Sequence, residues 1–100
     1  MKVKTCVWLP QYVEKLAAKH QVEPIEVEEV FTNRHKDFFW ETGDQPGEDF
    51  YSSLGQTNEG RYLRVFFILK KSGDALIISA RDMDGKERKR YAKKEANQTG

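Results

Sequence analysis

The sequence predicts a single α+β domain, because helical and strand-like segments are grouped along the chain and do not alternate. Alternating apolar residues predict a short opening strand over residues 3–7, and two helical segments follow it. Four further strand-like segments come later, over residues 36–41, 50–54, 61–69 and 75–81. One hundred residues suffice for one domain with one modest core. We therefore predict an antiparallel sheet of three to four strands, with two N-terminal helices and one C-terminal helix.

The two N-terminal helices are predicted from prolines and from apolar spacing. Pro10 suits the first turn of a helix over residues 10–20, and Pro24 suits the same position of a second helix. Glutamates near the start of the second helix match the positive end of its dipole. Asn33 is expected to end this helix, because asparagine tolerates the left-handed backbone conformation.

The hairpin of residues 61–81 and the basic segment after it are the most informative part of the chain. Strict alternation in the first strand places Leu63, Val65, Phe67 and Leu69 on one face and Arg64, Phe66 and Ile68 on the other. Strict alternation in the returning strand places Leu76, Ile78 and Ala80 on one face and Ile77, Ser79 and Arg81 on the other. Asp84 and Glu87 have the spacing of a capping box and begin a predicted helix over residues 84–95. The domain thus spans residues 1–95, and residues 96–100 are expected to be a frayed tail.

The net charge of +1 hides an asymmetry between the two parts of the chain. Residues 1–60 hold six Lys/Arg and eleven Asp/Glu, a charge of −5, whereas residues 61–100 hold eleven and five, a charge of +6. This separation predicts a basic face that binds a polyanion or an acidic protein partner. The alternative is a terminal helix whose lysines and arginines only keep the protein in solution.

Composition argues against several classes of function. No apolar run approaches the ~20 residues of a membrane-spanning helix, and the N-terminus lacks the apolar core of a secretion signal. Cys6 is the single cysteine and forms no internal disulfide, which suits a reducing cytoplasm. Neither His20 nor His35 has neighbours at metal-ligand spacing, so we expect no metal and no cofactor. The expected location is the cytoplasm.

The residues suggest four candidates for catalysis, which are Arg64, Arg81, Tyr91 and His20. The planar guanidinium fork matches phosphate oxygens, so Arg64 and Arg81 are expected to hold a phosphodiester; the alternative is a surface ion pair worth ~0–1 kcal/mol. Tyr91 is a candidate for stacking or proton transfer, although a tyrosine more often packs its ring on a sheet and leaves its hydroxyl in water. His20 can act as an acid or base, and its place in the last turn of a helix explains it equally well.

The chain carries the signature of a known family in Gly60-Arg61-x-Leu63, Ile77-Ile78-Ser79-Ala80-Arg81, Glu87 and Tyr91. Further matches follow the same order and similar spacing at Trp8, Lys19-His20, Val30-Phe31 and Leu54-Gly55. In these residues the chain resembles the BrnT family of toxins, which belong to two-gene toxin–antitoxin systems of bacteria and archaea. The resemblance covers about residues 3–94.

The resemblance implies a RelE-like fold, a ribonuclease activity that inhibits translation, and a cognate antitoxin that neutralises the toxin. Operator DNA is then contacted only through the toxin–antitoxin complex. By matching motif, the functional positions carried over are Trp8, Arg81, Glu87 and Tyr91, with His20 in addition. The expected RNA-binding residues are Trp8, Arg61 and Lys86. The expected partner-binding residues are Arg88, Lys89 and Arg90.

The expected reaction is metal-independent cleavage of RNA by attack of the 2′-hydroxyl on the adjacent phosphate. Arg64 and Arg81 would stabilise the developing charge, and Tyr91 or His20 would transfer a proton. The chain departs from the family pattern where Leu9, Tyr12, Leu16 and Phe50 replace residues that are usually polar. These departures favour the alternative, a non-catalytic domain that binds an antitoxin-like protein or nucleic acid.

Overall fold

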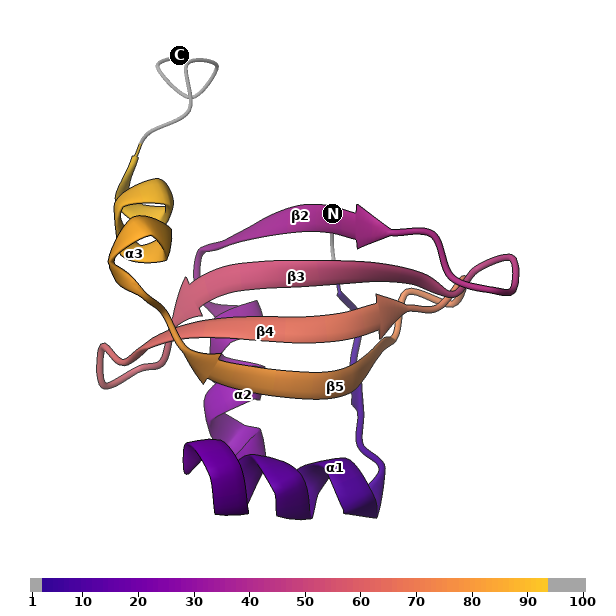
Figure 1. Cartoon of the computed structure of the whole chain (residues 1–100), viewed down its shortest axis with the longest axis horizontal. Coiled ribbons are helices and arrows are strands. Elements are labelled where there is room, and N and C mark those ends of the chain that lie inside the picture. The colour runs from indigo at the N-terminus through magenta and orange to yellow at the C-terminus, as the bar shows by residue number, and fades with distance from the viewer. Residues whose placement is uncertain (1–2, 94–100) are drawn as a thin grey trace.

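The computed structural model describes residues 3–93, and these form a five-stranded mixed sheet with three α-helices (Figure 1). The strands are β1 (Cys6–Val7), β2 (His35–Glu41), β3 (Asp49–Gln56), β4 (Tyr62–Leu69) and β5 (Ala75–Asp82). The helices are α1 (Pro10–Lys15), which continues as the π-helical segment η1 (Leu16–His20), α2 (Pro24–Thr32) and α3 (Gly85–Ala92). The predicted frayed tail at 96–100, and residues 94–95 of the predicted last helix, lie outside the described residues.

The α+β class is confirmed, but the predicted antiparallel sheet of three to four strands is wrong in detail. Strands β2 to β5 form an antiparallel meander, and β1 adds a fifth strand parallel to β5, in the order β1-β5-β4-β3-β2. The chain enters at the β5 edge, and the helical segments carry it to the opposite edge before the meander begins. The direction of β1 therefore depends on a pairing with a strand almost seventy residues away, which local sequence does not encode.

The N-terminal helical segments begin where the prolines predict and end as predicted, at His20 and just before Asn33, although the last turn of the first is π-helical. Pro10 and Pro24 both occupy the first turn of their helices. The left-handed residue is Gln21, at φ 53°, which ends η1. Asn33 ends α2 as predicted, but its backbone is extended at φ −86° and is not left-handed. Its side-chain amide instead donates to the Gln56 carbonyl at 3.0 Å, which ties the end of α2 to the end of β3.

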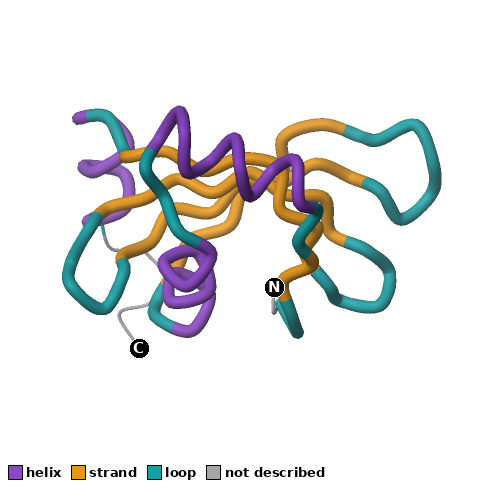
Figure 2. The backbone as a smooth tube through the Cα atoms, turned by 90° about the horizontal axis from the view of Figure 1, so that it is seen from below, coloured by secondary structure: helices purple, strands orange, loops and turns teal. Residues whose placement is uncertain are grey.

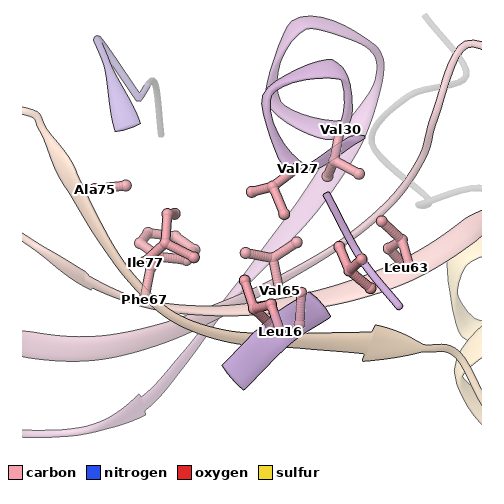
Figure 3. Packing of buried hydrophobic residues seen from close by; sticks show 10 residues of the cluster. Leu16, Val27, Val30, Leu63, Val65, Phe67, Ala75 and Ile77 are labelled. Carbon is pink, nitrogen blue, oxygen red and sulfur yellow. The ribbon is translucent and has the colours of Figure 1, made fainter. Parts of the chain in front are cut away.

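The main core lies between the sheet and the helical segments η1 and α2. Leu16, Val27 and Val30 pack against the face of the sheet that carries Leu63, Val65, Phe67, Ala75 and Ile77 (Figure 3). Strict alternation is confirmed for β4 and is wrong for β5, where Ile77 and Ala80 are both fully buried. The physical reason is a bulge, since Phe66 pairs with Ser79 but Phe67 pairs with Ile77. Ile78 is the extra residue, and the faces of β5 exchange there.

The opposite face of the sheet is covered at one end only. Figure 1 shows α2 behind the sheet and α3 beside its left end, and Figure 2 shows α2 standing on one side of the strands. Under α3 a second cluster joins Leu54, Met83 and Tyr91 to the partly buried Phe38 and Tyr62. The rest of this surface is not covered by α3, and it extends across the strands from Trp40 in β2 to Arg81 in β5. We call it the open face. Among residues 3–93, no helix has the length and apolar character needed to cross a membrane.

Candidate nucleic-acid interface

Arg64 and Arg81 lie directly opposite each other on the neighbouring strands β4 and β5. The bulge at Ile78 creates this pairing. Without the extra residue, the register at the turn would set Arg64 against Ala80 and would turn Arg81 toward the core. Bulges are frequent beside functional sites because they redirect a side chain. Here the bulge brings two guanidinium groups together on the open face.

Glu87 of α3 holds both guanidinium groups. Arg81 makes a bidentate pair with it, from Nη1 to Oε1 and from Nη2 to Oε2, each at 2.8 Å, and Arg64 Nη1 donates to Oε2. The predicted capping box of α3 is confirmed, and it fixes the carboxylate in place. The backbone N–H of Asp84 donates to Glu87 Oε1 at 2.9 Å, and the N–H of Glu87 donates to the Asp84 side chain at 2.8 Å. We call Arg64, Arg81 and Glu87 the arginine–glutamate cluster.

The arginine–glutamate cluster keeps one net positive charge. Hydrogen bonds from Arg81, then from the Asp84 backbone and Arg64, hold the pKa of the Glu87 carboxyl at about 2, below its ordinary 4.5. The same carboxylate raises the pKa of Arg81 above its ordinary value. Glu87 is therefore ionised at neutral pH, and two cations face one anion. It is a poor general base, because a carboxylate with this pKa binds protons weakly.

The two arginines remain accessible from the open face. The side chains of Arg64 and Arg81 are 29% and 35% exposed, whereas the side chain of Glu87 is 10% exposed. Arg64 Nη2 also reaches Ser52 Oγ at 3.3 Å, and among the described residues its buried Nε has no hydrogen-bond partner. The surface ion pair predicted as an alternative is thus present, but its carboxylate is buried. Each guanidinium group is held in a fixed orientation and keeps N–H groups that Glu87 does not bind. An oxyanion is bound by oriented N–H donors of this kind.

The remaining catalytic candidates do not join this cluster. Tyr91 packs its ring under α3 as expected, but its hydroxyl does not point to water: it donates to the Arg34 carbonyl at 2.9 Å. Arg34 in turn lies over the Tyr91 ring at 4.4 Å. His20 ends η1 on the helical side, where its carbonyl accepts from Arg61. Within residues 3–93 neither side chain is hydrogen-bonded to Arg64 or Arg81, so proton transfer by Tyr91 or His20 is not supported by the geometry.

A Tyr91→Phe variant tests the structural role of that hydroxyl. We expect the free energy of unfolding to fall by about 1 kcal/mol, because one hydrogen bond to a partly buried carbonyl is lost. RNA binding should not change, because the hydroxyl faces Arg34 and not the arginines. Urea denaturation and an RNA-binding titration measure the two effects. A large loss of RNA cleavage with unchanged stability would restore Tyr91 as a proton-transfer group.

The predicted RNA-binding residues are scattered over the molecule. Trp8 packs against the main core on the helical side, and its Nε1 donates to Glu28 at 3.2 Å. Arg61 connects three parts of the fold. Its guanidinium group pairs with Asp82 of β5 and Glu26 of α2, and it donates to two backbone carbonyls at the end of η1. Lys86 is exposed in the first turn of α3. Of these three residues, only Lys86 belongs to α3, the helix that carries Glu87.

The predicted partner-binding residues are all exposed on α3. The guanidinium group of Arg88 lies 4.2 Å from the centre of the Tyr62 ring, and that of Arg90 lies 3.8 Å from Phe38, on the other flank of the helix. Lys89 is exposed between them. Both arginines therefore pack their planes on aromatic rings and keep their charge at the surface.

Several contacts of this region were not predicted from the sequence. Lys36 Nζ donates to the carbonyls of Arg90 and Lys93, so a buried ammonium group caps the last turn of α3. Phe66 lies beneath the arginines, and Ser52 binds Arg64. Only alternation along the strands could have signalled these positions. No group of three or more histidine, cysteine or carboxylate side chains in residues 3–93 is arranged to hold a metal ion.

Comparison with models of known protein families finds no match, and a search of curated proteins finds no related sequence.

Proposed function

We propose that this chain is the BrnT-like toxin of a toxin–antitoxin pair, with a RelE-like fold, and that it inhibits translation as a metal-independent endoribonuclease. The observation that carries the proposal is the arginine–glutamate cluster. It presents two oriented guanidinium groups with a residual charge of one unit on an accessible sheet face. A phosphodiester carries one negative charge, and the fork geometry of arginine matches its oxygens.

In the proposed reaction the 2′-hydroxyl attacks the adjacent phosphorus and the 5′-oxygen of the next nucleotide leaves. Arg64 and Arg81 bind the two free phosphate oxygens and stabilise the extra charge that they gain in the phosphorane. Glu87 keeps the forks oriented and is not consumed. Proton movement to and from solvent completes the step, and the protein contributes orientation and electrostatic stabilisation.

The test is to express the chain alone in bacteria and to assay the purified protein on RNA. We expect growth arrest and RNA fragments that end in a 2′,3′-cyclic phosphate, with cleavage unaffected by EDTA. Fragments that carry other ends, or cleavage that EDTA abolishes, would contradict the mechanism. Normal growth together with no binding of RNA would contradict the function as a whole.

A second candidate is a domain that binds RNA or an antitoxin-like protein without cleaving RNA. It is favoured by the engagement of the Tyr91 hydroxyl with Arg34 and by the low pKa of Glu87, because neither group is then available to transfer a proton. RNA binding without any cleavage product would select this candidate over the first.

The partner proposed for either candidate is an antitoxin whose acidic or amphipathic segment covers α3. Reversing Arg88 and Lys89 to glutamate should lower the association rate by at least tenfold at low salt, because exposed charges steer encounter. Stopped-flow kinetics with the product of the adjacent gene, at low and moderate ionic strength, measures this rate. Reversal of the exposed Lys19 in η1 is the control and should have little effect. An association rate indifferent to salt and to the reversal would assign α3 no part in docking.

A further inference from the structure

An exposed tryptophan lies beside the arginine–glutamate cluster on the open face. The ring centre of Trp40, in β2, is 5.3 Å from that of Phe66 and 6.2 Å from that of Phe50. Phe66 in turn lies under Arg64 and Arg81, with its ring centre 4.8 Å and 5.7 Å from their guanidinium carbons. The sum of the shorter distances limits the indole and the Arg64 guanidinium to about 10 Å apart. Both groups are thus within reach of neighbouring nucleotides of one strand.

A second bulge presents Trp40 to solvent. The register between β2 and β3 shifts between Phe39 and Glu41, so Trp40 is the extra residue. Trp40 is 54% exposed, and Phe39 beside it is 57% exposed. The two rings lie on opposite faces, because Phe39 contacts Tyr51 on the helical side. Trp40 and Phe39 are thus similarly exposed, but only Trp40 lies on the same face of the sheet as Arg64 and Arg81.

We propose that Trp40, supported by Phe66, is a stacking platform for an unpaired base of single-stranded RNA, whose phosphate lies on Arg64 and Arg81. This inference rests on the proposed RNA-binding function of the cluster and names the form of RNA that it takes. Aromatic rings stack on splayed bases of any sequence, whereas an A-form duplex buries the faces of its bases. The positive charge alone would attract an acidic peptide as well as RNA. The exposed aromatic ring favours RNA, because RNA has flat bases that stack on such a ring.

The residues beside Phe66 suit this role. Its partners across the two neighbouring strands are Ser52 and Ser79, whose side chains are small. Glu87, whose carboxylate contacts both arginines, already accepts three side-chain hydrogen bonds from them and is buried. The accessible part of the site thus combines cationic forks with aromatic rings, which is the combination used by proteins that bind single strands.

The experiment measures the dissociation constant of the full chain for a short labelled oligoadenylate whose 2′-hydroxyls are methylated, so that it cannot be cleaved. Trp40→Ala should weaken binding by about tenfold, because one stacked base is lost. Trp40→Phe should recover most of this loss. Phe39→Ala is the matched control and should bind as the wild type does. In a Trp8→Phe background, the oligonucleotide should quench the emission of Trp40, and a matching duplex should not.

The outcomes separate this inference from the function on which it rests. If the wild type binds the oligonucleotide and Trp40→Ala binds equally well, the platform is wrong and the RNA-binding function stands. If the wild type binds no RNA, the proposed function itself fails. If Trp40→Ala spares RNA binding and weakens the complex with the adjacent gene product, the open face docks a protein and the platform is overturned. Circular dichroism of each variant checks that the exposed substitutions leave the fold intact.

Discussion

Replacing Glu87 by alanine should lower the free energy of unfolding by about 3 kcal/mol and the thermal midpoint by roughly 15 °C. The Glu87 side chain is 10% exposed, and its carboxylate accepts hydrogen bonds from both arginines and closes the capping box of α3. Its removal leaves two guanidinium groups close together with no anion between them. Urea denaturation at neutral pH measures the loss. Glu59→Ala, at an exposed loop position, is the control and should stay within ~0.5 kcal/mol of the wild type.

The same residue makes stability depend on acid. Because the folded-state pKa of Glu87 is about 2 against an ordinary 4.5, its contribution is complete above about pH 4.5 and declines as the pH falls toward 2. The difference in stability between the wild type and Glu87→Ala should therefore shrink from about 3 kcal/mol at pH 6 to near zero below pH 2. A difference that stays constant over this range would show that Glu87 acts through packing and capping alone.

The parts of the fold that local sequence determines were predictable. Pro10 and Pro24 mark the helix starts because proline presets the helical φ and lacks the N–H that would have no partner there, and Asp84 with Glu87 marks the start of α3 because the two side chains bind backbone N–H groups of its first turn. The parallel direction of β1 and the two bulges were not predictable. These features depend on which strand pairs with which and in what register. The residues around Trp40 and Ile78 do not determine that pairing.

The candidate site shows the same division. The arginines could be named from the chemistry of their side chains and from their place in the hairpin. Their opposition could not, because the register without a bulge turns Arg81 toward the core. The ion pairs of Arg61 were not predictable for a similar reason, since its partners Glu26 and Asp82 come from distant elements. Residue type predicts what a side chain can bind, and tertiary contacts decide whether it is already engaged.

The roles proposed for Arg81 and Glu87 predict opposite effects on RNA binding. Arg81→Ala should weaken binding and lower cleavage by at least tenfold, because one phosphate-binding fork is lost. Glu87→Gln should instead strengthen binding, because the net charge of the cluster rises from one to two units. The affinity falls as the salt concentration rises, and the slope of log affinity against log salt is negative. Its magnitude should be smaller by about 0.7 in Arg81→Ala and larger by about 0.7 in Glu87→Gln.

Stability cannot produce this pattern, because both substitutions break the same ion pair and both should lower the thermal midpoint. A general loss of folded protein would weaken RNA binding in both variants, whereas an electrostatic site changes in opposite directions. Arg81→Lys adds a further distinction: it keeps the charge and loses the fork, so the salt slope should persist while cleavage falls. Arg88→Ala is the control for an exposed cation on an aromatic ring and should reduce cleavage much less than Arg81→Ala does. If Arg81→Ala and Glu87→Gln lost RNA affinity equally, the cluster would be a structural ion pair. The open face would then have no phosphate-binding site.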